Sequence, residues 1–462
     1  MFNRRSFLKS VGASTVAGGV SAAATTQIAN KEDFLVSQES GRPQPPINMD
    51  RAFKVMAEEQ LDALIVTRPI NFYHFTGYMD HMSMRMDSPT SFAIICKDPQ
   101  CPSAVIMNQF IYYYSVVDNE FDWNYSVNLF SGWAAPSSED AADGNLLRTA
   151  APPFYLKSKN TAVERDFETA RLRELQATLE RTPPYGDPAH ALGHLMQSLS
   201  LTKARVGIDH PVTEHLLISQ LSTMTIVNGD HALRRIRLIK SPQEIDLMRR
   251  AASVNADSAL AAAKALRSGA TMREFRAQFF SECSIRGNTP KFIQIDTIMS
   301  EAVNNTFQDG AAFAIDAVSQ HGFYTGDYGR TVCIGEPSKT MRKATDAISL
   351  GWDAVTEMLK PGVRYSEIRR AGRAAIKKAG YDLDVAVTPH SVGLCHTDEP
   401  GRSALGYWEK DDLVLEKDMI ISVDMPVLHT GIGGSAHLED LTLITESGSE
   451  PINATGNRVI QV

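Results

Sequence analysis

The segment Asp316-Ala317-Val318-Ser319-Gln320-His321-Gly322-Phe323-Tyr324-Thr325-Gly326-Asp327 begins and ends with an acidic residue, in or beside apolar, β-branched sequence typical of strands. A bare carboxylate is costly to bury unless positive charge meets it. Three more metal-capable side chains follow in order: His390, Asp424 and Glu439. Four carboxylates and one imidazole suit one or two hard-to-borderline divalent cations. Each acid taken singly is better explained as a solvated strand end, but the ordered set favours a metal site.

Composition limits the kinds of partner. The chain has 462 residues, of which 43% are hydrophobic and 22% charged, as in ordinary globular proteins of one to three domains. Its net charge is -8, and Lys and Arg form no block beyond the N-terminus, which argues against nucleic acid as the main partner. Since no stretch of about 18 apolar residues occurs, the sequence predicts no stable membrane span.

The N-terminus resembles an export signal. Arg4 and Arg5 precede Phe7-Leu8, and a Gly/Ala-rich stretch from Val11 to Ala24 ends in small residues. This is the twin-arginine pattern, so we expect residues 1–30 to be a signal peptide handled by the twin-arginine translocase and the mature protein to be periplasmic or extracellular. A disordered basic tail is the alternative. A linker, residues 31–48, follows.

Five cysteines are present, so at least one thiol is unpaired within the chain. Cys96 and Cys101 are close enough in sequence to form a disulfide in an oxidising compartment, and equally both can be reduced.

Residues 49–235 alternate helix-like and strand-like segments, which predicts an α/β domain. The helical patterns cover Met49–Gln60, Phe167–Leu179 and Ala191–Leu199. The apolar strand candidates are Leu61–Val66, Phe92–Cys96, Ala104–Met107, Val206–Ile208 and Met224–Val227. The Ser/Ala/Asp-rich stretch Ser131–Gly144 predicts a loop.

Residues 236–462 form a second expected domain, of the α+β class. Ser241-Pro242-Gln243-Glu244 is a capping box with Pro at the first helical position, and Thr271 with Glu274 forms another. Leu-x-x-Gly with Glu five residues after the Gly occurs twice, ending at Gly269 and at Gly362. We interpret this as a weak internal duplication, with chance similarity as the alternative. It would bring ligands to one site from both halves of the domain.

These residues resemble the pita-bread metallohydrolases, and the two-domain layout is similar to aminopeptidase P, prolidase and creatinase. The resemblance rests on Asp316 and Asp327 followed by Gly329-Arg330-Thr331, on His390-Ser391-Val392-Gly393-Leu394, and on Leu438-Glu439-Asp440. Arg237–Ser241 with Glu244 resembles the family's entry to its first helix. The resemblance implies a creatinase-like N-terminal domain and a pita-bread C-terminal domain with a pseudo-twofold internal duplication.

The resemblance also implies a site with two divalent ions, Mn, Zn, Co or Fe. Asp327 and Glu439 would bridge the ions, Asp316 would complete one, and His390 with Asp424 the other. A water bridging the ions would supply the nucleophile. Asp424 and His396 would serve in catalysis. From its place three residues before Asp327, Tyr324 is a candidate for substrate contact, with a packed strand tyrosine as the alternative, and His437 is a second candidate for substrate contact.

Four departures from the family pattern concern the substrate and proton-transfer residues. Asp424 stands where Glu is usual, which shortens the side chain by about 1.5 Å. His396 lies six residues after His390, where the family has its His at seven. No His occurs in the 20 residues before Asp316, and His437 occupies a position that is often Arg.

Three functions remain open from the sequence. The first is an exported Xaa-Pro aminopeptidase or dipeptidase that uses a metal-bridging hydroxide. The second keeps the metal site but changes the substrate to a small non-peptide C–N compound or a lyase substrate, which the absent upstream His favours. The third is a non-catalytic binding protein on the same fold, against which the retained ligands argue. Relatives of this layout are often dimers, so the resemblance implies a homodimer.

Overall fold

The computed structural model describes residues 45–117, 125–131, 165–182, 184–382, 384–401, 410–453 and 455–462. The expected signal peptide, most of the expected linker and residues 132–144 of the expected loop lie outside these ranges. No helix among the described residues is long and apolar enough to cross a membrane.

A six-stranded mixed sheet forms the core of the N-terminal region, in the order β4-β3-β2-β1-β5-β6. Its strands are β1 (Ala63–Val66), β2 (Ser91–Cys96), β3 (Ser103–Asn108), β4 (Tyr125–Phe130), β5 (Arg205–Ile208) and β6 (Thr225–Asn228). The strands β1, β5 and β6 are mutually parallel, whereas β2 is antiparallel to both its neighbours. All five strand candidates of this region are confirmed, with boundaries shifted by no more than two residues.

Helices cover both faces of this sheet because its strands are apolar on both sides. Leu64 and Val66 belong to one core cluster and Ala63 and Ile65 to another, as the alternation of a strand requires. The helices are α2 (Met49–Glu58), α3 (Pro69–Thr76), α4 (His81–Met86), α5 (Gln109–Ser115), α6 (Asp166–Arg181), α7 (Pro188–Ser198), α8 (Pro211–Gln220) and α9 (Asp230–Leu238). A disulfide joins Cys96 at the end of β2 to Cys101.

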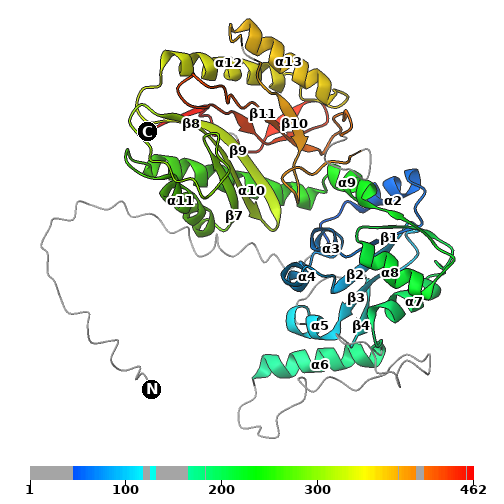
Figure 1. Ribbon diagram of the computed structural model, residues 1–462. Helices are drawn as coiled ribbons and strands as arrows, with labels where there is room; N and C mark the ends of the chain where they lie inside the picture. The colour runs from blue at the N-terminus through cyan, green and yellow to red at the C-terminus, as the bar shows by residue number, and fades with distance from the viewer. Residues whose placement is uncertain are drawn as a thin grey trace, which may run out of the picture. The chain divides into compact units, whose positions relative to one another are not determined.

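The C-terminal region contains two sheets, each with its own pair of helices (Figure 1). One sheet has the order β12-β9-β8-β7, with β15 parallel to β9. Its strands are β7 (Thr289–Ile295), β8 (Ala312–His321), β9 (Tyr324–Cys333), β12 (Glu439–Asp440) and β15 (Val459–Gln461). The other has the order β10-β11-β13-β14 and is formed by β10 (Thr388–Ser391), β11 (Ile420–Asp424), β13 (Thr442–Ile444) and β14 (Ser449–Pro451).

The helix pairs have matching local designs. The pair α10 (Pro242–Ala265) and α11 (Met272–Ile285) packs on β7 and β8, while α12 (Lys339–Thr356) and α13 (Tyr365–Lys378) pack near β10 and β11. Gly269 and Gly362 adopt φ of +87° and +91°, and five residues later Glu274 and Glu367 accept hydrogen bonds from the N-cap backbone of the next helix. The predicted Ser241–Glu244 and Thr271–Glu274 capping boxes are both present.

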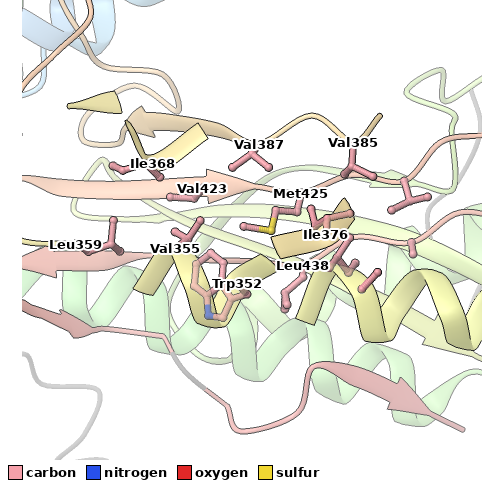
Figure 2. Close-up of a cluster of buried hydrophobic side chains, with 14 of the residues drawn as sticks. Trp352, Val355, Leu359, Ile368, Ile376, Val385, Val387, Val423, Met425 and Leu438 are labelled. Atoms are coloured by element: carbon pink, nitrogen blue, oxygen red, sulfur yellow. The ribbon is translucent and has the colours of Figure 1, made fainter. Parts of the chain in front are cut away.

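Buried apolar side chains of α12 and α13 pack in one cluster with side chains of β11 and of the segment just before β12 (Figure 2). Trp352 and Val355 of α12 belong to the same cluster as Val423 and Leu438. Since successive residues of a strand face opposite sides, the burial of Val423 and Leu438 turns Asp424 and Glu439 away from this core.

We predict that Gly326→Ala destabilises the protein by about 1–3 kcal/mol, because β9 and α10 approach each other too closely for a side chain there. A Cβ at position 326 would overlap the Ala251 carbonyl and lie 2.8 Å from the Cβ of Asn255. Denaturant unfolding measures the loss. Gly448→Ala is the control, since nothing lies within 4 Å of its added Cβ. Equal stabilities of the two variants would contradict this packing.

Candidate metal centre

The five predicted ligands lie on five different strands: Asp316 on β8, Asp327 on β9, His390 on β10, Asp424 on β11 and Glu439 on β12. Strand register explains their convergence. In the first sheet Asp316 pairs with Gly329 and Val318 pairs with Asp327, so the two acids are diagonal neighbours on one face. Glu439 pairs with Gly329 from the other side, which extends the same row. In the second sheet Thr388 pairs with Asp424 and His390 with Ser422, a second diagonal.

Three overlapping groups of donor atoms result, and within each group the atoms lie within 4.8 Å of one another. These are Asp316 with Asp327 and Glu439, His390 with Asp424 and Glu439, and Asp327 with His390 and His396. His390 Nε2 lies 3.2 Å from Asp424 Oδ2, 3.5 Å from Glu439 Oε1 and 3.8 Å from Asp327 Oδ2. The five predicted ligands therefore lie together in one cluster of the fold. That they bind metal stays a prediction.

Burial leaves several oxygen atoms of this cluster without hydrogen-bond donors. Asp327 and Glu439 are fully buried, and Asp316 Oδ1, both Asp327 oxygens and Glu439 Oε2 accept no hydrogen bond. Buried polar atoms normally find a partner, and the exceptions call for an explanation such as an ion. Hard divalent cations prefer this kind of oxygen-rich donor set, and the imidazole of His390 extends the range to Mn, Fe, Co and Zn. The residues thus fit a metal centre.

The pKa values of the acids in the cluster also indicate that too little positive charge surrounds them. Burial, together with repulsion from Asp327, raises the pKa of Asp316 to about 7. Burial and repulsion from Asp327 and Asp424 raise the pKa of Glu439 well above its usual range. Although burial opposes it, hydrogen bonding to His390 and His437 holds the pKa of Asp424 well below the ordinary value. A bound cation would lower the raised pKa values of Asp316 and Glu439, because it stabilises their ionised forms.

His396 lies at the edge of the cluster despite its shifted position in the sequence. Its Nε2 is 3.1 Å from Asp327 Oδ2, its ring contacts those of His390 and Phe292, and its side chain is 34% exposed. A half-exposed imidazole beside buried ligands is placed to meet a bound molecule. Its catalytic role stays a prediction.

The two residues predicted to contact substrate, Tyr324 and His437, instead contact other side chains of this chain. Tyr324 is fully buried and donates its hydroxyl proton to Glu244 on α10 at 2.9 Å, which leaves it no access to a substrate. It lies three residues before Asp327 and therefore on the opposite face of β9. His437 is 4% exposed and faces Asp424 instead of solvent, with its Nε2 3.1 Å from Asp424 Oδ1.

Other residues hold the ligands in place and were not assigned to the site from the sequence. Ser422 donates to Glu439 Oε1 at 2.6 Å. Arg237 pairs with the buried Asp398 at 2.8 Å, which fixes the segment that carries His396. Arg330 pairs with Asp440 at 2.7 Å and donates to the Glu439 carbonyl.

Comparison with known proteins agrees with this geometry. Residues 246–446 match the model of metallopeptidase family M24. The chain is 25% identical over 242 residues to the Xaa-Pro dipeptidase of Pyrococcus furiosus, a match that covers 50% of this chain and 67% of that protein.

Solved structures share the fold over most of the chain. An X-Pro aminopeptidase from Thermotoga maritima aligns with a TM-score of 0.65 at 15% identity, covering 88% of this chain and 100% of that one. A dipeptidase from Pyrococcus horikoshii aligns with a TM-score of 0.66 at 14% identity, covering 90% and 99%. The expected pita-bread fold is confirmed. The segment that contains every predicted ligand matches the M24 metallopeptidase model, and M24 peptidases use two divalent metal ions.

We predict that the affinity for Mn²⁺ rises steeply between pH 6 and pH 8. The pKa of Asp316 is about 7, and the pKa values of Glu439 and His390 are also raised. At lower pH these groups carry protons, which must leave before a cation binds. Each proton released makes the affinity change about tenfold per pH unit. Titration calorimetry in buffers of different ionisation enthalpy counts these protons.

Asp316→Asn is the matched variant, because it removes one titrating group and keeps the shape of the side chain. It should release fewer protons and bind Mn²⁺ more weakly. A wild-type affinity that is independent of pH across this range would contradict the arrangement.

Proposed function

We propose that the protein is an exported dinuclear-metal hydrolase that cleaves Xaa-Pro peptides, as an aminopeptidase or dipeptidase. The observation that carries the proposal is the set of buried oxygens of Asp316, Asp327 and Glu439 that accept no hydrogen bond within a domain of the M24 type. Similarity to the Xaa-Pro dipeptidase of Pyrococcus furiosus supports the substrate class.

The five ligands would hold the ions in the roles implied by their order. Asp327 and Glu439 each belong to two of the three donor groups and would bridge the ions. Asp316 would complete one ion, and His390 with Asp424 the other. When bound, such a pair of ions polarises a peptide carbonyl and provides an activated water at neutral pH.

The remaining chemistry falls to side chains that can move a proton. The carboxylate of Asp424 is 24% exposed, so it can exchange a proton with a molecule in the cleft. His396 Nε2 stands beside Asp327 at the exposed edge, where it can hold a hydrogen bond to the substrate carbonyl or protonate the departing nitrogen. Ser422 and Arg330 keep Glu439 oriented from its side chain and its backbone.

A second candidate keeps this centre and changes the substrate to a small non-peptide C–N compound. Its support is the absence of a His from residues 296–315, just before Asp316, together with the shorter Asp424. A substrate panel that includes Xaa-Pro dipeptides, longer Xaa-Pro peptides, small amides and guanidino compounds separates the two candidates.

We predict that chelator abolishes hydrolysis of Xaa-Pro peptides and that Mn²⁺, Co²⁺ or Zn²⁺ restores it. His396→Ala should lower kcat by roughly 10²-fold or more, as expected for loss of a proton-transfer group, while two ions stay bound. Initial rates and elemental analysis give both values. The control is His321→Ala, which removes an imidazole bonded to the Gly287 carbonyl away from the ligands. A fully loaded protein that leaves every Xaa-Pro peptide intact would sink the substrate assignment.

We further propose that the protein reaches the periplasm or the cell exterior through the twin-arginine route, on the evidence of Arg4 and Arg5 and the Gly/Ala-rich stretch behind them. That route carries folded proteins, so metal loading would precede export. A variant with Lys at positions 4 and 5 should remain in the cytoplasm when cells are fractionated. The unaltered signal and a cytoplasmic marker enzyme are the controls, and unchanged export of the variant would refute this route.

A further inference from the structure

His437 departs from the family pattern at the same centre as Asp424, and the two side chains face each other. His437 lies two residues before Glu439, the first residue of β12, so both point to the same side. Its Nε2 lies 3.1 Å from Asp424 Oδ1 and 3.6 Å from Glu439 Oε2.

Asp424 and Glu439 each divide their two oxygens between two imidazoles. Asp424 Oδ2 and Glu439 Oε1 face His390, at 3.2 and 3.5 Å. Asp424 Oδ1 and Glu439 Oε2 face His437. Two donor atoms that lie about 2.1 Å from one ion are separated by roughly 3 to 3.5 Å, and both sets of distances are near this range. Each of the two carboxylates thus turns one oxygen toward each imidazole.

The other ring nitrogen of His437 has the partner that a ligating histidine requires. Nδ1 lies 3.3 Å from the backbone carbonyl of Ile315, which can only accept a hydrogen bond. A ring that donates from Nδ1 directs the lone pair of neutral Nε2 toward Asp424 and Glu439. A backbone carbonyl that orients a histidine in this way is typical of metal ligands.

The fold also makes room for this ring. Gly329 on β9 stands opposite both Asp316 and Glu439, and a Cβ there would lie 2.5 Å from His437 Cε1 and Nδ1. Glu439 Oε2, which faces the ring, accepts no hydrogen bond from it. The Nε2 of the ring is bonded to Asp424 Oδ1. A cation between the ring and both carboxylates would replace that bond and would satisfy Glu439 Oε2 as well.

We propose that His437 is a sixth metal ligand, so that each of the two ions is bound by its own imidazole, His390 on one side and His437 on the other. Because His437 would bind the ion directly, it would compensate for the side chain of Asp424, which is shorter than the usual Glu. This inference rests on the proposed dinuclear centre, but it concerns binding and not turnover. The contrary interpretation is that His437 only donates a hydrogen bond to Asp424 and positions it.

Proton NMR of the Co²⁺-loaded protein separates the two interpretations. Ring N–H protons of histidines bound to Co²⁺ are shifted far outside the ordinary spectrum and disappear in D₂O. We expect two such signals in the wild type. His437→Gln should lose one of them, and His390→Gln should lose the other. His321→Ala should keep both signals.

Equilibrium dialysis against Co²⁺ gives a second readout. A glutamine amide at position 437 can still donate a hydrogen bond to Asp424 but is a poor ligand, so the second Co²⁺ should bind at least about tenfold more weakly. Circular dichroism checks that the variant is folded. A single shifted N–H signal in the wild type, or unchanged binding of both ions by folded His437→Gln, would overturn the proposal. Neither readout needs peptide cleavage, so failure of the substrate assignment and failure of this ligand are distinguishable.

Discussion

Mutual repulsion among buried carboxylates is the constraint that organises the C-terminal region. Asp316, Asp327 and Glu439 present oxygens to one another with few donors nearby, and the raised pKa values of Asp316 and Glu439 express the resulting cost. A fold tolerates such an arrangement when a cation returns more free energy than the burial costs. The strands, their register and the packed helices can all be understood as holding these groups together until metal binds.

The fold meets this requirement by using two similar halves. Each half supplies a sheet whose apolar face is covered by a helix pair and whose opposite face carries acidic residues or histidine at diagonal positions. Val423 and Leu438 show the principle most directly, since their burial under α12 determines which way Asp424 and Glu439 point. The N-terminal region contributes to the same architecture through Asn71, which bonds to Arg237, the partner of Asp398 in the segment that carries His396.

Local sequence was enough to predict both capping boxes and five strands of the N-terminal region, because those features depend on residues close together in the chain. The candidate ligands lie far apart in the chain, so their set was predicted from their order and spacing and from the family resemblance. The alternation of side chains along a strand places Asp440 on the face opposite Glu439, where the structure shows it bonded to Arg330. Tyr324 could have been excluded by the same alternation, since it lies three residues from Asp327. The partners of Arg237 and His437 could not be predicted, because those contacts join residues far apart in the sequence: Asp398 to Arg237, and Ile315 and Asp424 to His437.

The central claim is that these dispersed side chains bind two cations at one place. Anomalous X-ray scattering from crystals of the metal-loaded protein, recorded above and below the absorption edge of the bound element, tests it most directly. The account predicts two difference peaks per chain, each within coordinating distance of carboxylate oxygens from Asp327 or Glu439. A loaded protein with no peak among Asp316, Asp327, His390, Asp424 and Glu439, or with its metal bound elsewhere, would contradict it.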